Sequence, residues 1–558
     1  MIARCGVRGG VAALLGWLVC AASASAAPPS VIRTGGPSAP GDSKVAVVAA
    51  GTPLAGRRFS VVTPSGRTVL RGTLRRAAGT PAPWRFAATA DLSAVKAPGR
   101  YRVRAAGLTS PSWTVSAGAR SALVRRMLRL FAVQSDGNEP NPVFKPAHLK
   151  DAIVKGGPLD GQRIDLTGGW RDAGDQLKFA STTAFSVALL HLAARLDPAD
   201  AAALRATSGV GLRFLQKAHP APGVFIALVG DERDHVGFRD PASDDANTQP
   251  GVGVRFAYPT TGSNILGSVA AALALAGAQS PGAGGDQLIA AAREWYAAGK
   301  AADALVPIQD PNVSDFYPDN IFTDDMAFGA LELFRATGEQ GFLDDALAFF
   351  ARGDDDRMFF SGTVVGAVGP IVAADLCGIL GAPAPSEAAR QAGCAGVRKV
   401  VAAGRDRARE SAFGTPGIVT FGWVQDNGGA GAIAAAAGTA RVVADGRTLG
   451  AGARDYLLGR NPWGASFVVG PGSRDAKNPH SPVFLKGPPS KLVNGAVEGG
   501  IARASDFAGS GLKLTLRRFK VFNSPFAQYE DRRENFVTSE IGLAYSAASI
   551  LLASSLGR

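Results

Sequence analysis

The chain has 558 residues, of which 46% are hydrophobic and 19% charged. This length allows two or more domains, and the composition indicates a globular protein with a large buried core. The formal charge of +13 comes from scattered basic residues without a basic tail interleaved with aromatic residues, so nucleic-acid binding is not expected.

Residues 1–26 are typical of a secretory signal peptide. Arg4 and Arg8 make its start positive, residues 11–20 are apolar, and small residues at 24–26 form a cleavage site. We therefore expect an exported protein, periplasmic or extracellular, that loses this segment. No later segment is long and apolar enough to predict a membrane span.

The region from about Ser30 to Val115 has the pattern of a β-domain. Short runs of β-branched and aromatic residues alternate with turn sequences such as Pro64-Ser65-Gly66. The clearest predicted strands are 44–48, 59–62, 68–70 and 101–104. Strands of this length and spacing predict a β-sandwich over residues 27–116.

From residue 119 to residue 558 the pattern is helical, with apolar residues recurring on one face. Thr323-Asp324-Asp325 is a well-capped helix start, and Gly338 is the matching stop. Further predicted helices are 181–196, 200–217, 264–278, 286–301, 341–351, 387–403, 428–442 and 537–555. Many helices joined by long loops predict an all-α domain, either a closed helical barrel or an array of bundles.

Two of the four cysteines lie in the predicted signal peptide. The remaining pair, Cys377 and Cys394, would enter a compartment that permits disulfides, so we predict a local disulfide. Metal ligation is less favoured, because no histidine lies near either cysteine in the sequence.

Gly168 to Asp175 is a glycine-rich loop that carries two aspartates, Asp172 and Asp175. Glycines open backbone angles and leave room around the carboxylates, so the pair suits general-base work on a water molecule. The alternative is structural, an Asx turn followed by a helix N-cap.

A second cluster runs from Tyr529 through Asp531 to Glu540, directly before the final predicted helix. The apolar stripe of that helix predicts that Glu540 lies in its opening turn, fixed against the core. The alternative is a glutamate that merely favours the positive end of the helix dipole. Asp531 either orients this segment or caps it.

The chain resembles the cellulase-type glycoside hydrolases of family nine in four stretches that follow the family's order. Gly168–Asp175 is similar to its catalytic-base loop and Thr323–Gly338 to its mid-barrel helix. Leu458–Gly470 with Pro479-His480 is similar to its sugar-binding histidine segment, and Tyr529–Glu540 to its acid signature. Residues 30–115 are similar to the immunoglobulin-like domain of some members.

The resemblance implies an immunoglobulin-like sandwich followed by an (α/α)6 barrel that hydrolyses β-1,4-linked glucan chains or their oligosaccharides with inversion. It implies Asp175 as general base, Asp172 as the second aspartate that holds the water, and Glu540 as general acid. Inversion requires a separation of roughly 6.5–9.5 Å between the base and acid carboxyls. We expect Glu540 to be kept protonated by an apolar surround and the two aspartates to stay ionised.

The resemblance also implies His480 as a contact to the sugar in the cleaved subsite. Tyr529 and Trp463 fall within matched motifs and are further candidates for substrate binding, as is Asp531. Trp170 and Trp423 each offer a flat apolar face to a sugar ring, with core packing as the alternative for Trp423.

The likeness fails at several positions around the cleaved sugar. Pro482 stands where the family usually has an arginine, and Ser539 and Ser546 stand where asparagines are usual. Arg171 and Gln176 replace aromatic or histidine-type residues in the aspartate loop. These departures leave open an exo-acting enzyme on short gluco- or glucosamine oligosaccharides and a non-catalytic glycan-binding protein. A polysaccharide lyase is a separate alternative, which would need a tyrosine or histidine base facing a uronate held by basic residues.

No cofactor or metal is predicted from the residues. Calcium is possible, since some family members bind it, but the acidic cluster Gly353–Asp356 has no ligand spacing that assigns a site. The expected partner is an oligo- or polysaccharide substrate, and the oligomeric state is not predicted.

Overall fold

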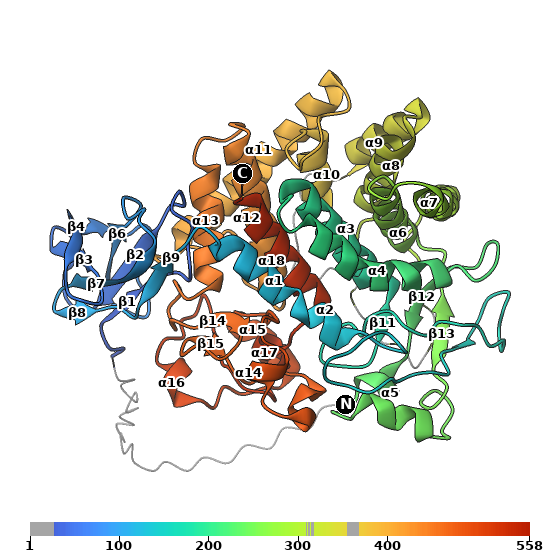
Figure 1. Ribbon diagram of the computed structural model, residues 1–558, viewed down its shortest axis with the longest axis horizontal. Coiled ribbons are helices and arrows are strands. Elements are labelled where there is room, and N and C mark those ends of the chain that lie inside the picture. The colour runs from blue at the N-terminus through green and yellow to red at the C-terminus, as the bar shows by residue number, and fades with distance from the viewer. Residues whose placement is uncertain are drawn as a thin grey trace, which may run out of the picture.

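The computed structural model describes residues 27–557 apart from 309, 311–312, 314–316, 318 and 354–367. The predicted signal peptide and the aspartates at 354–356 lie outside the described residues. A small β-domain lies beside a larger helical domain (Figure 1). Among the described residues, no helix is long and apolar enough to cross a membrane.

The β-domain is a sandwich of two antiparallel sheets, as the strand pattern predicts. One sheet has the order β1-β2-β6-β5, and the other has the order β4-β3-β7-β8 with β9 paired to β7. On β7 (Gly99–Ala105), Tyr101, Val103 and Ala105 are buried while the arginines between them are exposed, because alternate side chains of a strand face opposite ways. The other strands are β1 (Val31–Arg33), β2 (Val45–Ala50), β3 (Arg58–Val62), β4 (Thr68–Thr73), β5 (Arg75–Arg76), β6 (Phe86–Asp91), β8 (Leu108–Thr109) and β9 (Trp113–Val115).

Six helices of the described chain are packed in a closed sequence of neighbours at the centre of the larger domain. They are α3 (Ala180–Leu196), α6 (Ser263–Gly277), α8 (Thr323–Thr337), α10 (Gly369–Leu376), α12 (Trp423–Thr439) and α18 (Leu543–Ser555). Each contacts the next, and α18 contacts α3. Most are apolar nearly all round, which is the pattern of a helix surrounded by other helices.

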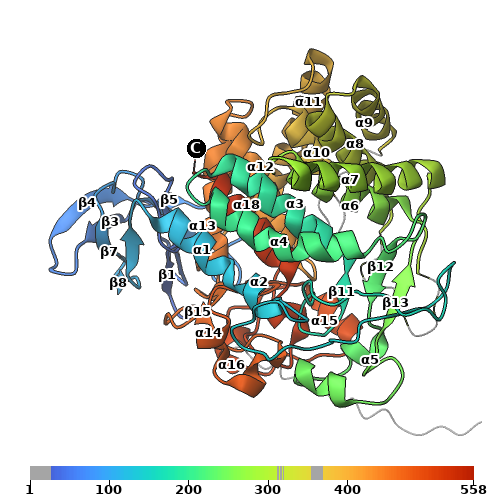
Figure 2. The ribbon, with the colours of Figure 1, turned by 45° about the vertical axis from the view of Figure 1, so that its right-hand side comes forward.

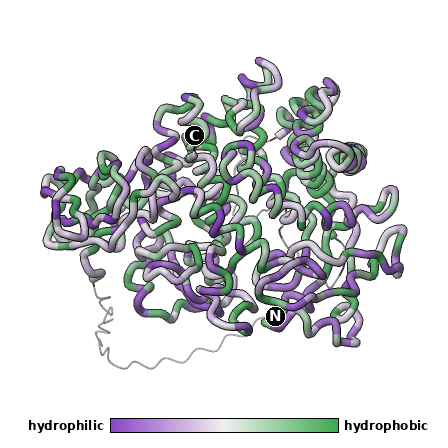
Figure 3. Tube along the Cα trace, viewed as in Figure 1, coloured by the Kyte–Doolittle hydropathy of each residue, from purple (hydrophilic) through white to green (hydrophobic). Residues whose placement is uncertain are grey.

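A second helix packs on the outside of each inner one (Figure 2). These outer helices are α1 (Ala119–Met127) on α18, α4 (Ala201–Lys217) on α3, α7 (Ala283–Ala302) on α6, α9 (Gln340–Arg352) on α8, α11 (Glu387–Glu410) on α10 and α13 (Gly446–Leu457) on α12. They expose a polar face, and the hydrophobic stretches of the chain follow the central helices (Figure 3). Apart from the start of the final one, the predicted helices agree with the structure, including α8, which ends at Gly338 with φ 74°.

Short elements gather at one end of this assembly, and the sequence pattern did not predict them. They include a sheet of order β10-β13-β12-β11, a two-stranded sheet, and several short helices. Their bounds are α2 (Arg129–Gln134), β10 (Ile153–Val154), β11 (Lys178–Phe179), β12 (Ile226–Val229), α5 (Glu232–His235), η1 (Pro241–Ala246), β13 (Phe256–Pro259), β14 (Ser466–Val469), β15 (Asp475–Ala476), η2 (Pro482–Lys486), α14 (Pro489–Leu492), α15 (Ala504–Ser510), α16 (Arg517–Lys520) and α17 (Phe536–Ser539). Segments of two to seven residues are too short to show a hydrophobic period.

Cys377 and Cys394 form a disulfide with a Cα–Cα distance of 4.7 Å. It joins the end of α10 to α11, so it links an inner helix to the outer helix packed on it.

Candidate active site

The loop that carries Asp172 and Asp175 is held by its own backbone. The amide of Asp172 donates to the carbonyl of Leu177 at 2.9 Å, and the amide of Leu177 donates to Asp175 Oδ1 at 3.0 Å. The two bonds fold the chain back on itself between the aspartates. The loop leads into β11 and then α3, so its carboxyls lie at the end of the inner helices.

Glu540 lies beside this loop. The amide of Gly174 donates to Glu540 Oε1 at 3.2 Å, and the amide of Leu543 donates to the carbonyl of Asp172 at 3.1 Å. Residues more than 350 positions apart in the chain are thereby joined at both a side chain and a backbone group. The structure brings Asp172, Asp175 and Glu540 together.

The predicted position of Glu540 in the opening turn of the last helix is wrong. The residue is extended, with φ −67° and ψ 138°, and α18 begins only at Leu543. Its backbone pairs with other extended segments instead: it bridges His480, and its carbonyl accepts from the Gly499 amide at 2.8 Å. The helix dipole is therefore not what holds Glu540.

Gly174 allows the base loop and the acid to approach. A Cβ at this position would lie 2.7 Å from both Cδ2 and the carbonyl oxygen of His480, and 3.0 Å from Glu540 Oε1. Such distances are shorter than van der Waals contact, so a side chain here would push the segments apart. In the sequence, the signal for this close approach is the place of Gly174 between the two aspartates.

Burial raises the pKa of all three carboxyls. It raises the pKa of Asp172 to about 6, and it raises that of Glu540 to about 8 with help from the Asp172 charge. The pKa of Asp175 lies well above its usual value, first because of burial and then because of the charges of Asp172 and Glu540. At neutral pH the protonated Glu540 and the ionised Asp172 agree with the expectation. The raised pKa of Asp175 opposes the expected ionised base, because burial and the neighbouring charges outweigh the hydrogen bond that it accepts.

Two tyrosines that the sequence analysis missed complete this cluster. The hydroxyl of Tyr317 donates to Asp172 Oδ2. Tyr545 is buried, and its pKa is raised well above the usual value by burial and then by the charges of Glu540 and Asp172. Tyr317 comes from an irregular segment without a motif, and Tyr545 is indistinguishable in the sequence from the apolar stripe of the last helix.

His480 lies next to the acid, as the resemblance implies. Its Nδ1 donates to the carbonyl of Arg533 at 2.7 Å, so Nε2 is the acceptor of a neutral ring. Burial lowers the pKa of this histidine, which favours the neutral form. Phe238 packs on the ring at 4.6 Å between centroids.

Three aromatic residues proposed as sugar contacts are instead part of the core. Trp170 and Tyr529 are 0% exposed, and Trp463 is 6% exposed. The Tyr529 hydroxyl donates to Glu498 Oε2 at 2.8 Å, and the rings of Tyr529 and Trp463 pack together. None presents an open face to a ligand, and the same is true of Trp423, which is 0% exposed. Membership in a sequence motif did not reveal that these side chains point inward.

Asp531 orients the segment that leads to His480. Its Oδ1 accepts from the amide of Asn478 at 2.8 Å, and its Oδ2 accepts from the amide of Lys477 at 3.1 Å. The side chain is buried, so of the two alternatives for Asp531 the orienting one fits these contacts. A cavity of about 430 Å³ adjoins this segment and is lined in part by Asn478, Pro479 and Arg533.

The described residues contain no group of three or more histidine, cysteine, aspartate or glutamate side chains arranged to hold a metal ion. The candidate site is therefore built from carboxyl groups, tyrosine hydroxyls and one imidazole. Three clustered carboxyls with raised pKa values, at one end of the inner helices, define a site for acid–base chemistry.

Comparison with known families agrees with this class of site. The family model for glycosyl hydrolase family 9 matches residues 121–553, and that for the cellulase N-terminal ig-like domain matches residues 39–110. The chain belongs to glycosyl hydrolase family 9 and carries an N-terminal immunoglobulin-like β-domain.

Among curated relatives, Endoglucanase 13 of Arabidopsis thaliana is 32% identical over 232 residues, which is 40% of this chain and 46% of that protein. A cellodextrinase of Butyrivibrio fibrisolvens is 31% identical over 140 residues, covering 24% of this chain and 25% of that protein. The chain thus spans less than half the length of these relatives.

Among solved structures, a metagenome-derived glycoside hydrolase family 9 endoglucanase superposes with a TM-score of 0.78 at 23% identity, covering 95% of this chain and 99% of that one. A single-mutant thermostable endoglucanase from Alicyclobacillus acidocaldarius superposes with a TM-score of 0.78 at 21% identity, covering 95% and 100%. At this identity the likeness establishes the fold.

Proposed function

We propose that the protein is an inverting glycoside hydrolase that cleaves β-1,4-linked glucan chains or their oligosaccharides. The observation that carries the proposal is the contact of Glu540, a carboxyl with a pKa of about 8, with the loop of Asp172 and Asp175. A carboxylic acid that keeps its proton at neutral pH beside a carboxylate pair is what inverting hydrolysis requires.

In the proposed reaction, Glu540 donates its proton to the glycosidic oxygen as the bond to the anomeric carbon breaks. Asp175 accepts a proton from a water molecule whose oxygen attacks that carbon from the other face, and Asp172 holds the same water. The sugar leaves as the α-anomer, and one water is consumed. The Tyr317 hydroxyl stabilises the charged form of Asp172.

The neutral His480 fits a contact to sugar hydroxyls, because its Nε2 can accept a hydrogen bond while Nδ1 stays bonded to Arg533. Tyr529, Trp463 and Asp531 act indirectly in this account, by holding the acid segment and the segment of His480.

We also infer that the ring of inner and outer helices is an (α/α)6 barrel spanning residues 119–558. Residues 27–116 form the immunoglobulin-like domain, and residues 1–26 are a signal peptide that directs export. The pairing of each inner helix with an outer one supports the barrel.

The relatives named endoglucanases support a β-1,4-glucan substrate. An exo-acting enzyme on short gluco- or glucosamine oligosaccharides is the second candidate. The observation that favours it is Pro482, which begins η2 with its ring buried and stands two residues after His480, where the resemblance places an arginine.

The test is hydrolysis of soluble cello- and glucosamine-oligosaccharides by the mature protein, Asp175→Asn and Glu540→Gln, with products separated by chromatography. We expect turnover by the wild type on the cello series and a loss of about 10³-fold or more in each variant. A ladder of product lengths indicates endo action, and one small product indicates exo action. Turnover that survives both substitutions would refute the proposal.

A further inference from the structure

We propose that His148, as an imidazolium cation, is a positioning residue that joins the two segments holding the catalytic-base loop. This inference rests on the proposed function, because it explains how Asp172 and Asp175 are kept in place. His148 lies outside the cluster of carboxyls, and neither the motifs nor the comparisons assign it a role.

The first holding segment is the end of α2 and the residues after it. The carbonyl of Gln134 accepts from the amide of Arg171 at 2.9 Å, and its side-chain amide donates to the carbonyl of Ala173 at 2.5 Å. The amide of Asp136 donates to the carbonyl of Gly169 at 2.9 Å. This segment therefore fixes the loop at three points around Asp172.

The second holding segment lies between α5 and β13. The amide of Gln176 donates to the carbonyl of Asp234 at 3.3 Å, and the guanidinium of Arg255 donates to the carbonyl of Gln176. Arg239 ties this segment together, because it pairs with Asp234 and with Asp244 at 2.7 Å each. These contacts fix the loop on the Asp175 side.

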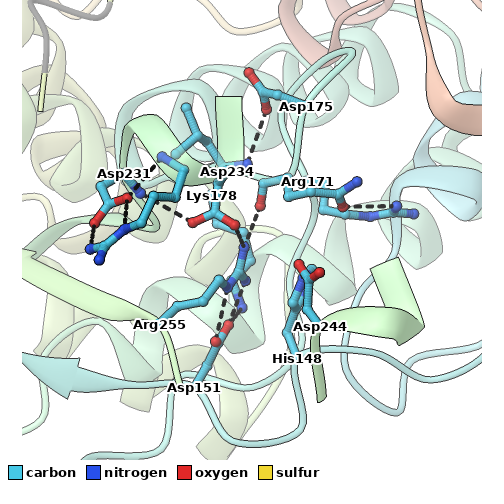
Figure 4. A network of polar contacts seen from close by, with 12 residues as sticks. His148, Asp151, Arg171, Asp175, Lys178, Asp231, Asp234, Asp244 and Arg255 are labelled. Atoms are coloured by element: carbon cyan, nitrogen blue, oxygen red, sulfur yellow. Dashed lines mark hydrogen bonds and ion pairs between the residues drawn. The ribbon is translucent and has the colours of Figure 1, made fainter. Parts of the chain in front are cut away.

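His148 bridges one segment to the other. Its Nδ1 lies 2.8 Å from Asp136 Oδ2, and its Nε2 lies 3.1 Å from Asp244 Oδ2. All three side chains are buried, and Figure 4 shows His148 and Asp244 beside each other. An ionised carboxylate only accepts hydrogen bonds, and a neutral imidazole has one N–H, so only the imidazolium donates to both partners.

The surrounding charges agree with a protonated ring. Burial and the Arg255 guanidinium push the pKa of His148 down, but Asp136 and Asp244 outweigh them and raise it above its usual value. Arg255 is itself paired with Asp151 at 2.6 Å and lies 3.4 Å from Asp136 (Figure 4).

Lys178 and Asp234 also face this network. Lys178 Nζ pairs with Asp151 at 2.6 Å, lies 3.5 Å from Asp136, and donates to the carbonyl of Gly168 at 3.1 Å. Arg255 Nη1 lies 3.8 Å from Asp234. The cations and carboxylates are thus interleaved, and removing the positive charge of His148 leaves Asp136 and Asp244 with one cationic partner fewer between them.

The contacts of Asp136 and Asp244 connect His148 to the catalytic-base loop. Asp136 holds Gly169, and Asp244 holds the arginine that fixes Asp234, so a shift at either carboxylate moves the base loop. A displacement of about 1 Å in a catalytic group costs on the order of 100-fold in rate.

The first test does not depend on turnover. Histidine labelled with ¹⁵N is incorporated into the full chain, which has 5 histidines, and spectra are recorded at pH 8 for wild type and His148→Gln. We expect one ring with both nitrogens protonated in the wild type, and its absence in the variant. A neutral His148 at this pH would overturn the inference.

The second test separates positioning from stability. We expect His148→Gln to lower kcat on cello-oligosaccharides by about 10- to 100-fold, with KM changed less than about twofold.

His191→Gln is the matched control. This histidine is equally buried, and its Nε2 contacts Ser208 Oγ at 2.9 Å between α3 and α4, remote from the base loop. We expect His191→Gln to lower Tm and leave kcat unchanged. Equal kcat in both histidine variants, at a temperature where both are folded, would reduce His148 to a structural role. A wild type without turnover would instead refute the proposed function, while the NMR spectrum still reports the state of His148.

Discussion

At the scale of single residues, Gly174 sets how closely the base loop and the acid approach. We predict that Gly174→Ala lowers kcat/KM by about 100-fold, because its Cβ would displace His480 or Glu540 by a substantial fraction of an ångström. Gly209→Ala is the control: it lies in α4, and its Cβ would meet only the end of Arg213, at 3.5 Å. Equal activity in both variants, measured on a cello-oligosaccharide, would contradict the account.

The raised pKa values predict a pH profile displaced towards neutrality. Above the pKa of about 8 at Glu540 the acid has lost its proton, which sets the alkaline limb. The acid limb belongs to the aspartates: the pKa of Asp172 is about 6, and burial together with the Asp172 and Glu540 charges raises the pKa of the base, Asp175, well above its usual value. We therefore expect kcat/KM to be bell-shaped, with an acid limb displaced upward from that of an ordinary aspartate and an alkaline limb near pH 8. An acid limb near pH 4, where an ordinary aspartate titrates, would show that burial does not raise the pKa of the base.

Tyr317→Phe tests the hydroxyl that donates to Asp172. Its loss removes a bond to the charged form, so the pKa of Asp172 rises and the acid limb moves to higher pH. We expect kcat/KM to fall about threefold at pH 6, because the loss of one hydrogen bond of ~1 kcal/mol raises the pKa by ~0.7, and much less at pH 8. A uniform loss at every pH would point to displacement of the loop instead.

The motifs in the sequence predicted which residues would share one site, as at Asp172, Asp175, Glu540 and His480, which lie together. Side-chain direction was not predictable: the same motifs contain Trp170 and Tyr529, which point into the core. Their orientation depends on neighbours that are remote in the chain and leave no local pattern.

At the scale of elements, Tyr529 and Glu498 join the acid segment to the strand-like segment beside it. Tyr529→Phe removes the donor to a fully buried carboxyl, so we predict a loss of about 1–3 kcal/mol in the free energy of unfolding, measured with urea. KM should be unchanged, since Tyr529 has no exposed surface. A higher KM at unchanged stability would restore Tyr529 as a sugar contact.

The long elements were predictable because each repeats its period several times. Short β-branched and aromatic runs between turns identified four strands of the sandwich, β2, β3, β4 and β7. Among the helices, α3, α4, α6, α7, α9 and α11 begin or end within a few residues of their predicted bounds. The predicted final helix was too long, because residues 540–542 are extended and pair with other segments. The sheet of β10, β11, β12 and β13 forms from strands of two to four residues, and only tertiary contacts define it.

At the scale of the whole molecule, the β-domain is anchored to the helical domain by a buried ion pair. Arg454 of α13 pairs with Asp42 and with Asp455, and the Trp84 ring packs on Phe413 and Phe522. We predict that Asp42→Ala destabilises the protein by about 3 kcal/mol, because Arg454 stays buried with one carboxylate fewer.

Thermal unfolding of Asp42→Ala should remain one transition at a lower Tm, and the exposed Asp91→Ala should behave as wild type. Two separate transitions in the wild type would show that the two domains unfold independently and would contradict this prediction.

The central claim is that Glu540 and the aspartate loop hydrolyse a β-glycosidic bond with inversion, and the anomeric form of the first product tests it most directly. Proton NMR during early turnover of a cello-oligosaccharide should show the α-anomer released by the wild type and none by Glu540→Gln. Release of the β-anomer, or equal release by both proteins, would contradict the account.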